Sequence, residues 1–428
     1  MPPVGSAIVA RARRTAGGLR PDRQLRRLIE LLGPTGDAAR QSLVALGFNS
    51  ATSFAAGAML VGFEGTWRRL APMLILVPAA IGLRGNVYST LGNRLSTSIH
   101  TGTFRVSFKP DSVLGQNLIA SFSLTAAMSV VLAAFAKVLA TGLGVEQEVT
   151  FLELTMVSVL GGLVGSVVVA AATVLLTMGA VRYEWDLDYL VAPSVSTLGD
   201  VITIPALWLA AQIVGHGDAA SILGGLLVIG TIGATVWTWQ TNLDLVREIF
   251  RESIPVLTAA LVLSALAGLV LQKQQDILHV LPALGVLQPA FVSSAGALGG
   301  ILCGRIATNL HIGSVEPTLV PGAETRRDFS LVLGLAVPLL LFNSFGAWLT
   351  ATITDSHASP GFGWLLSTSA LASVATLVFV GALAYFSTIG AWRFNVDPDT
   401  YGTPIVTASV DFVGTMALVV AAVALGLL

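Results

Sequence analysis

The sequence has little charge and almost no cysteine. Lysine, arginine, aspartate and glutamate make up 11% of the 428 residues, whereas soluble proteins carry about 25%. The single cysteine, Cys303, excludes a disulfide framework and a cysteine-built metal site. Five scattered histidines lack metal-ligand spacing, and a net charge of −1 offers no basic field for nucleic acid. These shortages disfavour soluble enzymes, soft-metal proteins and nucleic-acid-binding proteins.

Apolar residues, by contrast, are abundant. They make up 54% of the chain, and the mean hydropathy is +0.80. The 44 glycines suit close packing of membrane helices. Because a span needs roughly 20 mostly apolar residues, the sequence predicts an all-α integral membrane protein with eleven transmembrane helices. We expect them at 42–63, 71–99, 114–140, 152–180, 193–214, 221–239, 253–272, 279–308, 330–352, 363–389 and 404–427.

Basic residues gather near the N-terminus, where residues 1–40 hold eight of the 23. No continuous apolar run follows them, so we expect no cleaved signal peptide. The segment 23–32 is either a basic amphipathic helix lying against lipid headgroups or part of a disordered tail. With this end in the cytosol, the predicted inner loops hold most other basic residues, which is the positive-inside pattern. Eleven spans then place the C-terminus outside, and we expect the plasma membrane as the location.

The chain also repeats itself at a fixed offset of 211 residues. Arg94 matches Arg305, His100 matches His311, and Asp200 matches Asp411. Each copy contains five predicted spans, and the segment 221–239 matches neither copy. Two copies with an odd number of spans would insert in opposite orientations, and this segment adds one crossing between them. We therefore predict parallel repeats about a pseudo-two-fold axis along the membrane normal. The expected parts are a basic cytosolic segment, a first repeat, a linker helix and a second repeat, at residues 1–40, 41–215, 216–251 and 252–428.

Two aspartates lie inside predicted spans. Asp200 and Asp411 each stand seven residues after a proline that is expected in the first turn of a helix. That rise of about 10 Å places both carboxylates below the cytosolic surface, at equivalent positions about the pseudo-axis. An ionisable group there costs about 2.5–3.5 kcal/mol and is a functional candidate. Two facing carboxylates favour a hard divalent cation such as Mg²⁺, although each could instead cap or hydrogen-bond a neighbouring helix.

Other candidates surround the second span of each copy and the loops before the aspartates. Small and polar residues of the second span could line a pore or simply allow close helix packing. The predicted pore-lining residues are Gly85, Asn86, Ser89, Thr90, Gly296, Ala297 and Gly300. Candidates for an acidic inner mouth, or for solvated loop charge, are Asp186, Asp188, Asp397 and Asp399. Arg94 and Arg305 are candidate anchors or partners of carboxylates, and Arg84 is a candidate for a buried ion pair or for a position in a cytosolic cavity.

These motifs resemble a known family. The segment 82–97 is similar to the second-helix signature of solute carrier family 41, which is related to the MgtE magnesium channels. The segments 186–200 and 397–411 are similar to its fifth-helix signature, with Asp, Pro and Asp at seven-residue steps. The resemblance covers roughly 41–428. It implies a fused pseudo-dimer with a pore between second and fifth helices, where Asp200 and Asp411 bind Mg²⁺ and Asn86 lines the path.

The second copy departs from this signature. Ala297 stands where the asparagine is expected, and Ala307 replaces the serine. The two substitutions remove polar groups from the second span of that copy. We therefore expect the two copies to contribute unequally to a pore.

The sequence as a whole predicts transport of a divalent cation, foremost Mg²⁺, and no enzymatic activity. The resemblance leaves a channel and a sodium-coupled exchanger open, so Na⁺ and other divalent cations are further candidate ions. A transporter of a small organic solute would need aromatic and polar groups around a midplane cavity. A membrane enzyme could use the two carboxylates for acid–base chemistry. Expected partners are divalent ions and the lipid bilayer, with no nucleic acid, and a monomer could already form the pseudo-dimer.

Overall fold

The computed structural model describes residues 35–100, 103–142, 144, 149–183, 187–214, 218–273, 281–311, 313–353, 361–394 and 398–426. The chain divides into Met1–Ala45 and Leu46–Leu428, and the contacts below all belong to the second unit. The basic segment 23–32 lies outside the described residues. Within the described residues the regular structure is entirely helical. The helices are α3 (Thr35–Gly62), α4 (Glu64–Arg69), α5 (Met73–His100), α6 (Val113–Gly142), α7 (Phe151–Tyr183), α8 (Leu187–Ala211), α9 (Ala219–Gln240), α10 (Asp244–Lys273), α12 (Pro282–His311), α13 (Ala323–Ile353), α14 (Phe362–Arg393) and α15 (Pro398–Ala424).

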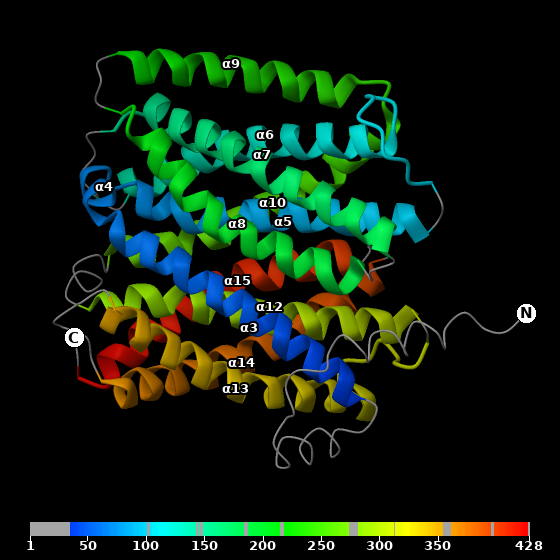
Figure 1. Cartoon of the computed structure of the whole chain (residues 1–428), viewed down its shortest axis with the longest axis vertical. Helices are drawn as coiled ribbons and strands as arrows, with labels where there is room; N and C mark the ends of the chain where they lie inside the picture. The colour runs from blue at the N-terminus through cyan, green and yellow to red at the C-terminus, as the bar shows by residue number, and fades with distance from the viewer. Residues whose placement is uncertain are drawn as a thin grey trace, which may run out of the picture. The chain divides into compact units, whose positions relative to one another are not determined.

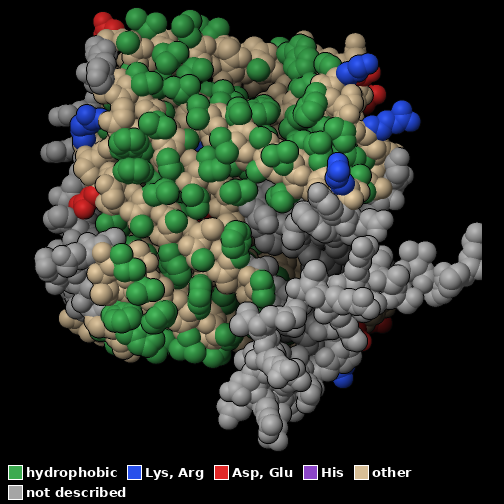
Figure 2. All heavy atoms as spheres, viewed as in Figure 1, with side chains coloured by type: hydrophobic (Ala, Val, Ile, Leu, Met, Phe, Trp, Pro, Cys, Tyr) green, Lys and Arg blue, Asp and Glu red, His purple; other side chains and the backbone are tan. Residues whose placement is uncertain are grey.

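Most of these helices are long and apolar enough to cross a bilayer. Nine of them qualify within the described residues. Of the eleven predicted spans, α3 and α8 are the two that do not qualify among the described residues, where α8 contributes the shorter apolar segment Thr197–Ala211. The count of eleven therefore stays a prediction. On the face seen in Figure 2, hydrophobic side chains cover the middle, and charged side chains gather at the left and right edges. This is the surface of an all-α integral membrane protein.

Local chemistry fixes where several helices begin. The hydroxyl of Thr150 accepts from the backbone N–H of Glu153 at 3.2 Å, and the Glu153 carboxylate accepts from the N–H of Thr150 at 2.8 Å. This reciprocal pair is a capping box, which stabilises the first turn of α7. Helix α10 begins at Asp244, well before the predicted start at 253, because an amphipathic segment that buries Val246, Ile249 and Phe250 precedes its apolar part.

The helix bounds recur at the offset seen in the sequence. Helices α3 and α10 end 211 residues apart, and so do α5 and α12. Helices α7 and α14 begin 211 residues apart, as do α8 and α15. The helix pairs that pack in the first copy, such as α5 with α8 and α7 with α8, pack again as α12 with α15 and α14 with α15.

The first helix of each copy packs against the other copy. A methyl group added at Gly57 of α3 would lie 2.8 Å from the Cα atom of Val286 in α12. A methyl group added at Gly268 of α10 would lie 2.7 Å from the Cα atom of Ile75 in α5. Gly268 and Ile75 are the 211-residue counterparts of Gly57 and Val286. Such reciprocal contacts are those of a two-fold interface, here formed within one chain.

Helix α9 stands apart from this pairing. It packs on α6 and α7, and Figure 1 shows it at the outer side of these two helices. Only 17% of its most apolar stretch of 18 residues is buried, and Ile222, Leu226 and Ile229 are each more than half exposed. An apolar helix with this exposure fits a lipid-facing position.

Candidate functional site

The first candidate aspartate, Asp200, lies on α8 of the first copy. Its side chain is 9% exposed, and it interacts by a hydrogen bond with Ser293 on α12 of the second copy. One turn earlier, the hydroxyl of Thr197 donates to the Asn49 amide oxygen at 3.1 Å. The Asn49 amide nitrogen in turn donates to the Ser293 hydroxyl at 2.8 Å. Asp200 therefore sits in a polar cluster that joins the two copies.

The second candidate, Asp411, lies on α15 of the second copy. The hydroxyl of Ser264, on α10, donates to its Oδ2 atom at 2.6 Å. Gly82 of α5 faces the same carboxylate, because a methyl group added there would lie 3.4 Å from Oδ2. Gly82 is the 211-residue counterpart of Ser293. Each aspartate thus faces the same position on the second helix of the opposite copy.

The two carboxylates also act on each other. The Asp411 carboxylate is close enough to repel the Asp200 carboxylate electrostatically. Among the described residues, neither carboxylate forms an ion pair with a basic side chain. The described residues also contain no group of three or more His, Cys, Asp and Glu side chains that could hold a metal ion. Asp200 is buried and Asp411 is half-buried. Two such repelling carboxylates with hydroxyl partners fit a hydrated Mg²⁺ better than a metal held in a cage of protein ligands.

The predicted pore-lining residues of α5 lie on one side of that helix. Gly85, Asn86, Ser89 and Thr90 are all partly exposed. The hydroxyl of Ser89 donates to the Gly85 carbonyl and that of Thr90 to the Asn86 carbonyl, both at 2.6 Å. Both hydroxyls therefore bond the backbone of their own helix. Their lone pairs remain able to accept from water.

The predicted residues of α12 behave differently. Ala297 and Gly300 are partly exposed, but Gly296 is buried. A methyl group added at Gly296 would lie 3.6 Å from Thr407 of α15, and one at Gly300 would lie 3.4 Å from Thr403. These glycines bring α12 and α15 close together. A role of Gly296 in lining a pore stays a prediction.

None of the four acidic residues predicted at an inner mouth has a side chain that the structure describes. Asp186 and Asp397 lie outside the described residues. Asp188 and Asp399 fall in α8 and α15, but their side chains are not among those described. Their role stays a prediction.

The two predicted anchors have different partners. Arg94 donates to the Ser253 hydroxyl at 3.3 Å, and the Glu252 and Glu248 carboxylates of α10 act on its guanidinium. Arg305 forms a 2.6 Å ion pair with Asp328 on α13. Asn309 supports that pair by donating to the second oxygen of Asp328 at 3.0 Å. Arg94 therefore ties the first copy to α10, whereas Arg305 acts within the second copy.

Sequence reasoning missed the serines around the carboxylates. A signal was present for Ser264, because Ser53 lies 211 residues before it. For Ser293 the offset gives glycine, so the repeat held no signal. Arg84 was a candidate for a buried ion pair. Among the described residues, it instead donates to the carbonyl oxygens of Gly162 at 3.3 Å and Ala80 at 3.2 Å.

Long apolar helices define a multi-pass integral membrane protein, and two carboxylates inside such helices are typical of an ion or substrate pathway. Comparison with known families is more specific. The model of the MgtE family, described as divalent cation transporters, matches residues 77–210 and 288–421. The two matches begin 211 residues apart, so the family domain is present in two copies. The chain belongs to the MgtE family of divalent cation transporters.

Curated relatives carry the name solute carrier family 41. Member 3 from Rattus norvegicus is 25% identical over 377 residues, covering 82% of this chain and 79% of the relative. Member 2 from Homo sapiens is 25% identical over 379 residues, covering 82% and 64%. Member 2 from Gallus gallus is 26% identical over 391 residues, covering 83% and 64%. No solved structure matches the chain.

Proposed function

We propose that this protein carries Mg²⁺ across the plasma membrane along a path between its two repeats. The observation that supports this most is the pair Asp200 and Asp411. Each faces the second helix of the opposite repeat, and the two repel each other without a basic partner among the described residues. A cation between them relieves that repulsion. A hydrated Mg²⁺ needs only one or two carboxylates.

The proposal includes the organisation of the chain. Residues 41–215 and 252–428 form parallel repeats, residues 216–251 supply the linker helix, and residues 1–40 lie in the cytosol. The C-terminus lies outside. Partly exposed small and polar residues of α5 and α12 border the ion path, and the acidic residues around the starts of α8 and α15 attract cations to its inner end. One chain supplies both halves of the path, as a pseudo-dimer.

Magnesium flux into proteoliposomes tests the site. We expect the Asp200→Asn/Asp411→Asn double variant to lose the flux, because neutral amides no longer attract a divalent ion. Asp218→Asn is the matched control, because Asp218 is an exposed carboxylate just before α9, and its flux should equal that of the wild type. Unchanged flux in the double variant would show that the ion binds elsewhere.

The same assay with and without a sodium gradient separates two modes of transport. Magnesium flux that ignores the gradient indicates a channel. Flux that follows the gradient indicates a sodium-coupled exchanger, which is the alternative supported by the family resemblance. Absence of magnesium flux in the wild type would favour transport of another ion or small solute.

A further inference from the structure

A polar contact joins α12 and α15 one helical turn beyond Asp411. The Gln288 amide nitrogen donates to the Thr415 hydroxyl at 2.9 Å, and that hydroxyl donates to the backbone carbonyl of Asp411. Thr415 follows Asp411 by four residues, so the two side chains lie on the same side of α15. The amide group of Gln288 therefore lies beside the row of residues that carries the aspartate.

Contacts along the two helices show on which side of the aspartate this amide lies. Gly300 of α12 faces Thr403, whereas Gln288 reaches Thr415. The helices are therefore antiparallel, and Asp411 stands between the two contacts. Because α15 leads to the C-terminus, which the proposed topology places outside, Gln288 belongs to the outer half of the path.

The Thr415 hydroxyl fixes which way the Gln288 amide is turned. A hydroxyl has a single proton, and Thr415 gives it to the carbonyl of Asp411. Its oxygen can then only accept, so Gln288 presents its N–H group to Thr415. Within the described residues nothing donates to the remaining Gln288 oxygen, Oε1. Gln288 is half-buried, and Oε1 is not among the fully buried oxygen atoms that lack a partner. It is a free acceptor that water can reach.

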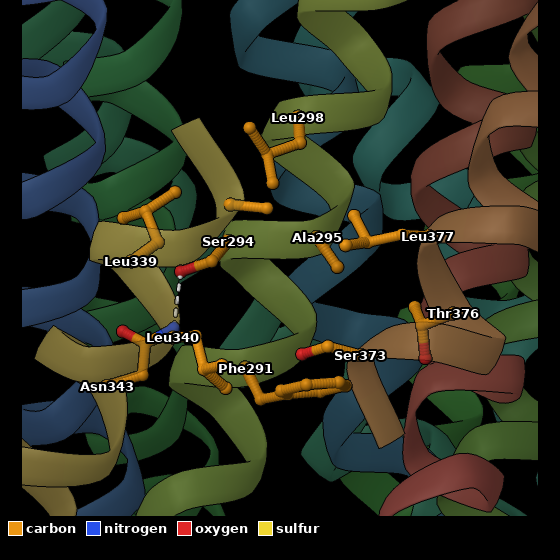
Figure 3. A pocket seen from close by; sticks show the side chains of 11 residues that line it. Phe291, Ser294, Ala295, Leu298, Leu339, Leu340, Asn343, Ser373, Thr376 and Leu377 are labelled. Atoms are coloured by element: carbon orange, nitrogen blue, oxygen red, sulfur yellow. Dashed lines mark hydrogen bonds between the residues drawn. The ribbon is translucent and has the colours of Figure 1, made fainter. Parts of the chain in front are cut away.

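The hollow inside the second repeat does not account for this acceptor. Figure 3 shows that hollow between α12, α13 and α14, with Phe291 and Ser294 of α12 in its lining. Gln288 and Ser293 are not among the lining residues. Both therefore lie on another side of α12, and Ser293 is the residue that meets Asp200.

The polar lining of the proposed path changes from one repeat to the other at the level of the aspartates. On the inner side, α5 carries the amide of Asn86 where α12 has Ala297. On the outer side, α12 carries the amide of Gln288 where α5 has Val77, and the counterpart of its hydroxyl partner is Ile204. Val77 and Ile204 are each 1% exposed. Each half of the path thus receives an amide from one repeat only.

We propose that Gln288 binds the hydrated ion on the outer side of the aspartate pair. Magnesium keeps several of its waters, and those waters are donors that need acceptors. The Gln288 Oε1 atom accepts from one of them. The inference rests on the proposed transport of Mg²⁺ past the aspartates, and it adds a second level of binding to that path.

A purely structural role of Gln288 would depend on the other end of its amide. If the residue only braces α15, the N–H donor to Thr415 is the group that matters. Gln288→Glu loses that donor, keeps an oxygen acceptor and adds a negative charge. Gln288→Val, which installs the residue of the first repeat, loses both the donor and the acceptor. The two substitutions therefore separate binding from bracing.

The dependence of magnesium flux into proteoliposomes on Mg²⁺ concentration tests the proposal. We expect Gln288→Val to raise the half-saturating concentration by about threefold, the effect of one hydrogen bond. Gln288→Glu should lower it by about threefold, because a carboxylate attracts the cation. Gln240→Val and Gln240→Glu are the matched controls, since Gln240 is exposed at the end of α9, and both should behave like the wild type. The midpoint of thermal unfolding without Mg²⁺ checks that each variant folds.

Shifts in opposite directions support the proposal, and the direction of the Gln288→Glu shift decides it even where Gln288→Val lowers the unfolding midpoint. A raised half-saturating concentration in both variants overturns it, because the residue then braces α15. Wild-type behaviour of both variants also overturns it. Those two results leave the proposed function standing. Unchanged flux in Asp200→Asn/Asp411→Asn, or no magnesium flux in the wild type, overturns the proposed function and this inference together.

Discussion

Arg84 combines a fixed charge with a position inside a membrane-spanning helix. Among the described residues it pairs with no carboxylate, and its donors reach backbone carbonyl groups. The glycines of α7 make this possible, because a methyl group added at Gly162 or Gly165 would lie 3.3 Å from the guanidinium. The side chain therefore fills space between α5 and α7 more than it completes an ion pair.

This interpretation predicts a difference between two substitutions. Arg84→Ala should lower stability by about 2–5 kcal/mol, because it leaves a cavity between packed helices. Arg84→Met should retain stability within about 1.5 kcal/mol, because a flexible apolar chain of similar length refills the space. The midpoint of thermal unfolding in detergent measures both. Equal losses in the two variants would show that the charge itself holds these helices together.

At the scale of elements, the packing of the first helix of each copy against the other copy depends on two glycines. Gly57 and Gly268 bring α3 and α10 within van der Waals contact of the backbone of α12 and α5. Both contacts are with backbone atoms, which cannot move aside as a flexible side chain can. The two copies are therefore joined by reciprocal helix packing as well as by polar contacts.

We expect Gly57→Ala and Gly268→Ala each to destabilise the protein by about 1–3 kcal/mol, the usual cost of overpacking. Gly225→Ala in α9 is the control, because nothing lies within 4 Å of its added methyl group. It should be neutral or stabilise by about 0.5–1 kcal/mol, since alanine favours a helix more than glycine does. Unfolding midpoints of the three purified variants decide the matter, and a neutral Gly268→Ala would argue against close packing of α10 on α5.

At the scale of the whole molecule, the orientation of the two repeats decides whether their equivalent surfaces face the same side of the membrane. Phe108 and Leu319 lie in equivalent loops, 211 residues apart, and each is 66% exposed. Parallel repeats place both loops in the cytosol. Antiparallel repeats would place them on opposite sides.

Cysteine labelling distinguishes these arrangements. The chain has one cysteine, the buried Cys303, so Cys303→Ala provides a cysteine-free background. In that background we expect Phe108→Cys and Leu319→Cys to react with a membrane-impermeant maleimide only from the cytosolic side. Lys273→Cys, at the exposed end of α10, should react only from outside. Labelling of positions 108 and 319 from opposite sides would contradict parallel repeats.

The fold class, the family and the duplication could all be predicted from the order of residues along the chain. Hydropathy and charge depletion identify membrane helices because the bilayer imposes its own length and polarity on each span. The offset of 211 residues was visible because Arg, His and Asp rarely recur by chance in a membrane protein. It also selected Asp200 and Asp411, whose binding of an ion remains a prediction.

The groups that meet those aspartates, and the way in which the copies are joined, follow from the packing of the helices in space. Ser293 and Ser264 reach the carboxylates from helices distant in sequence, and no periodicity within one helix encodes such a contact. The packing of α3 and of α10 against the opposite copy likewise depends on contacts across the whole bundle.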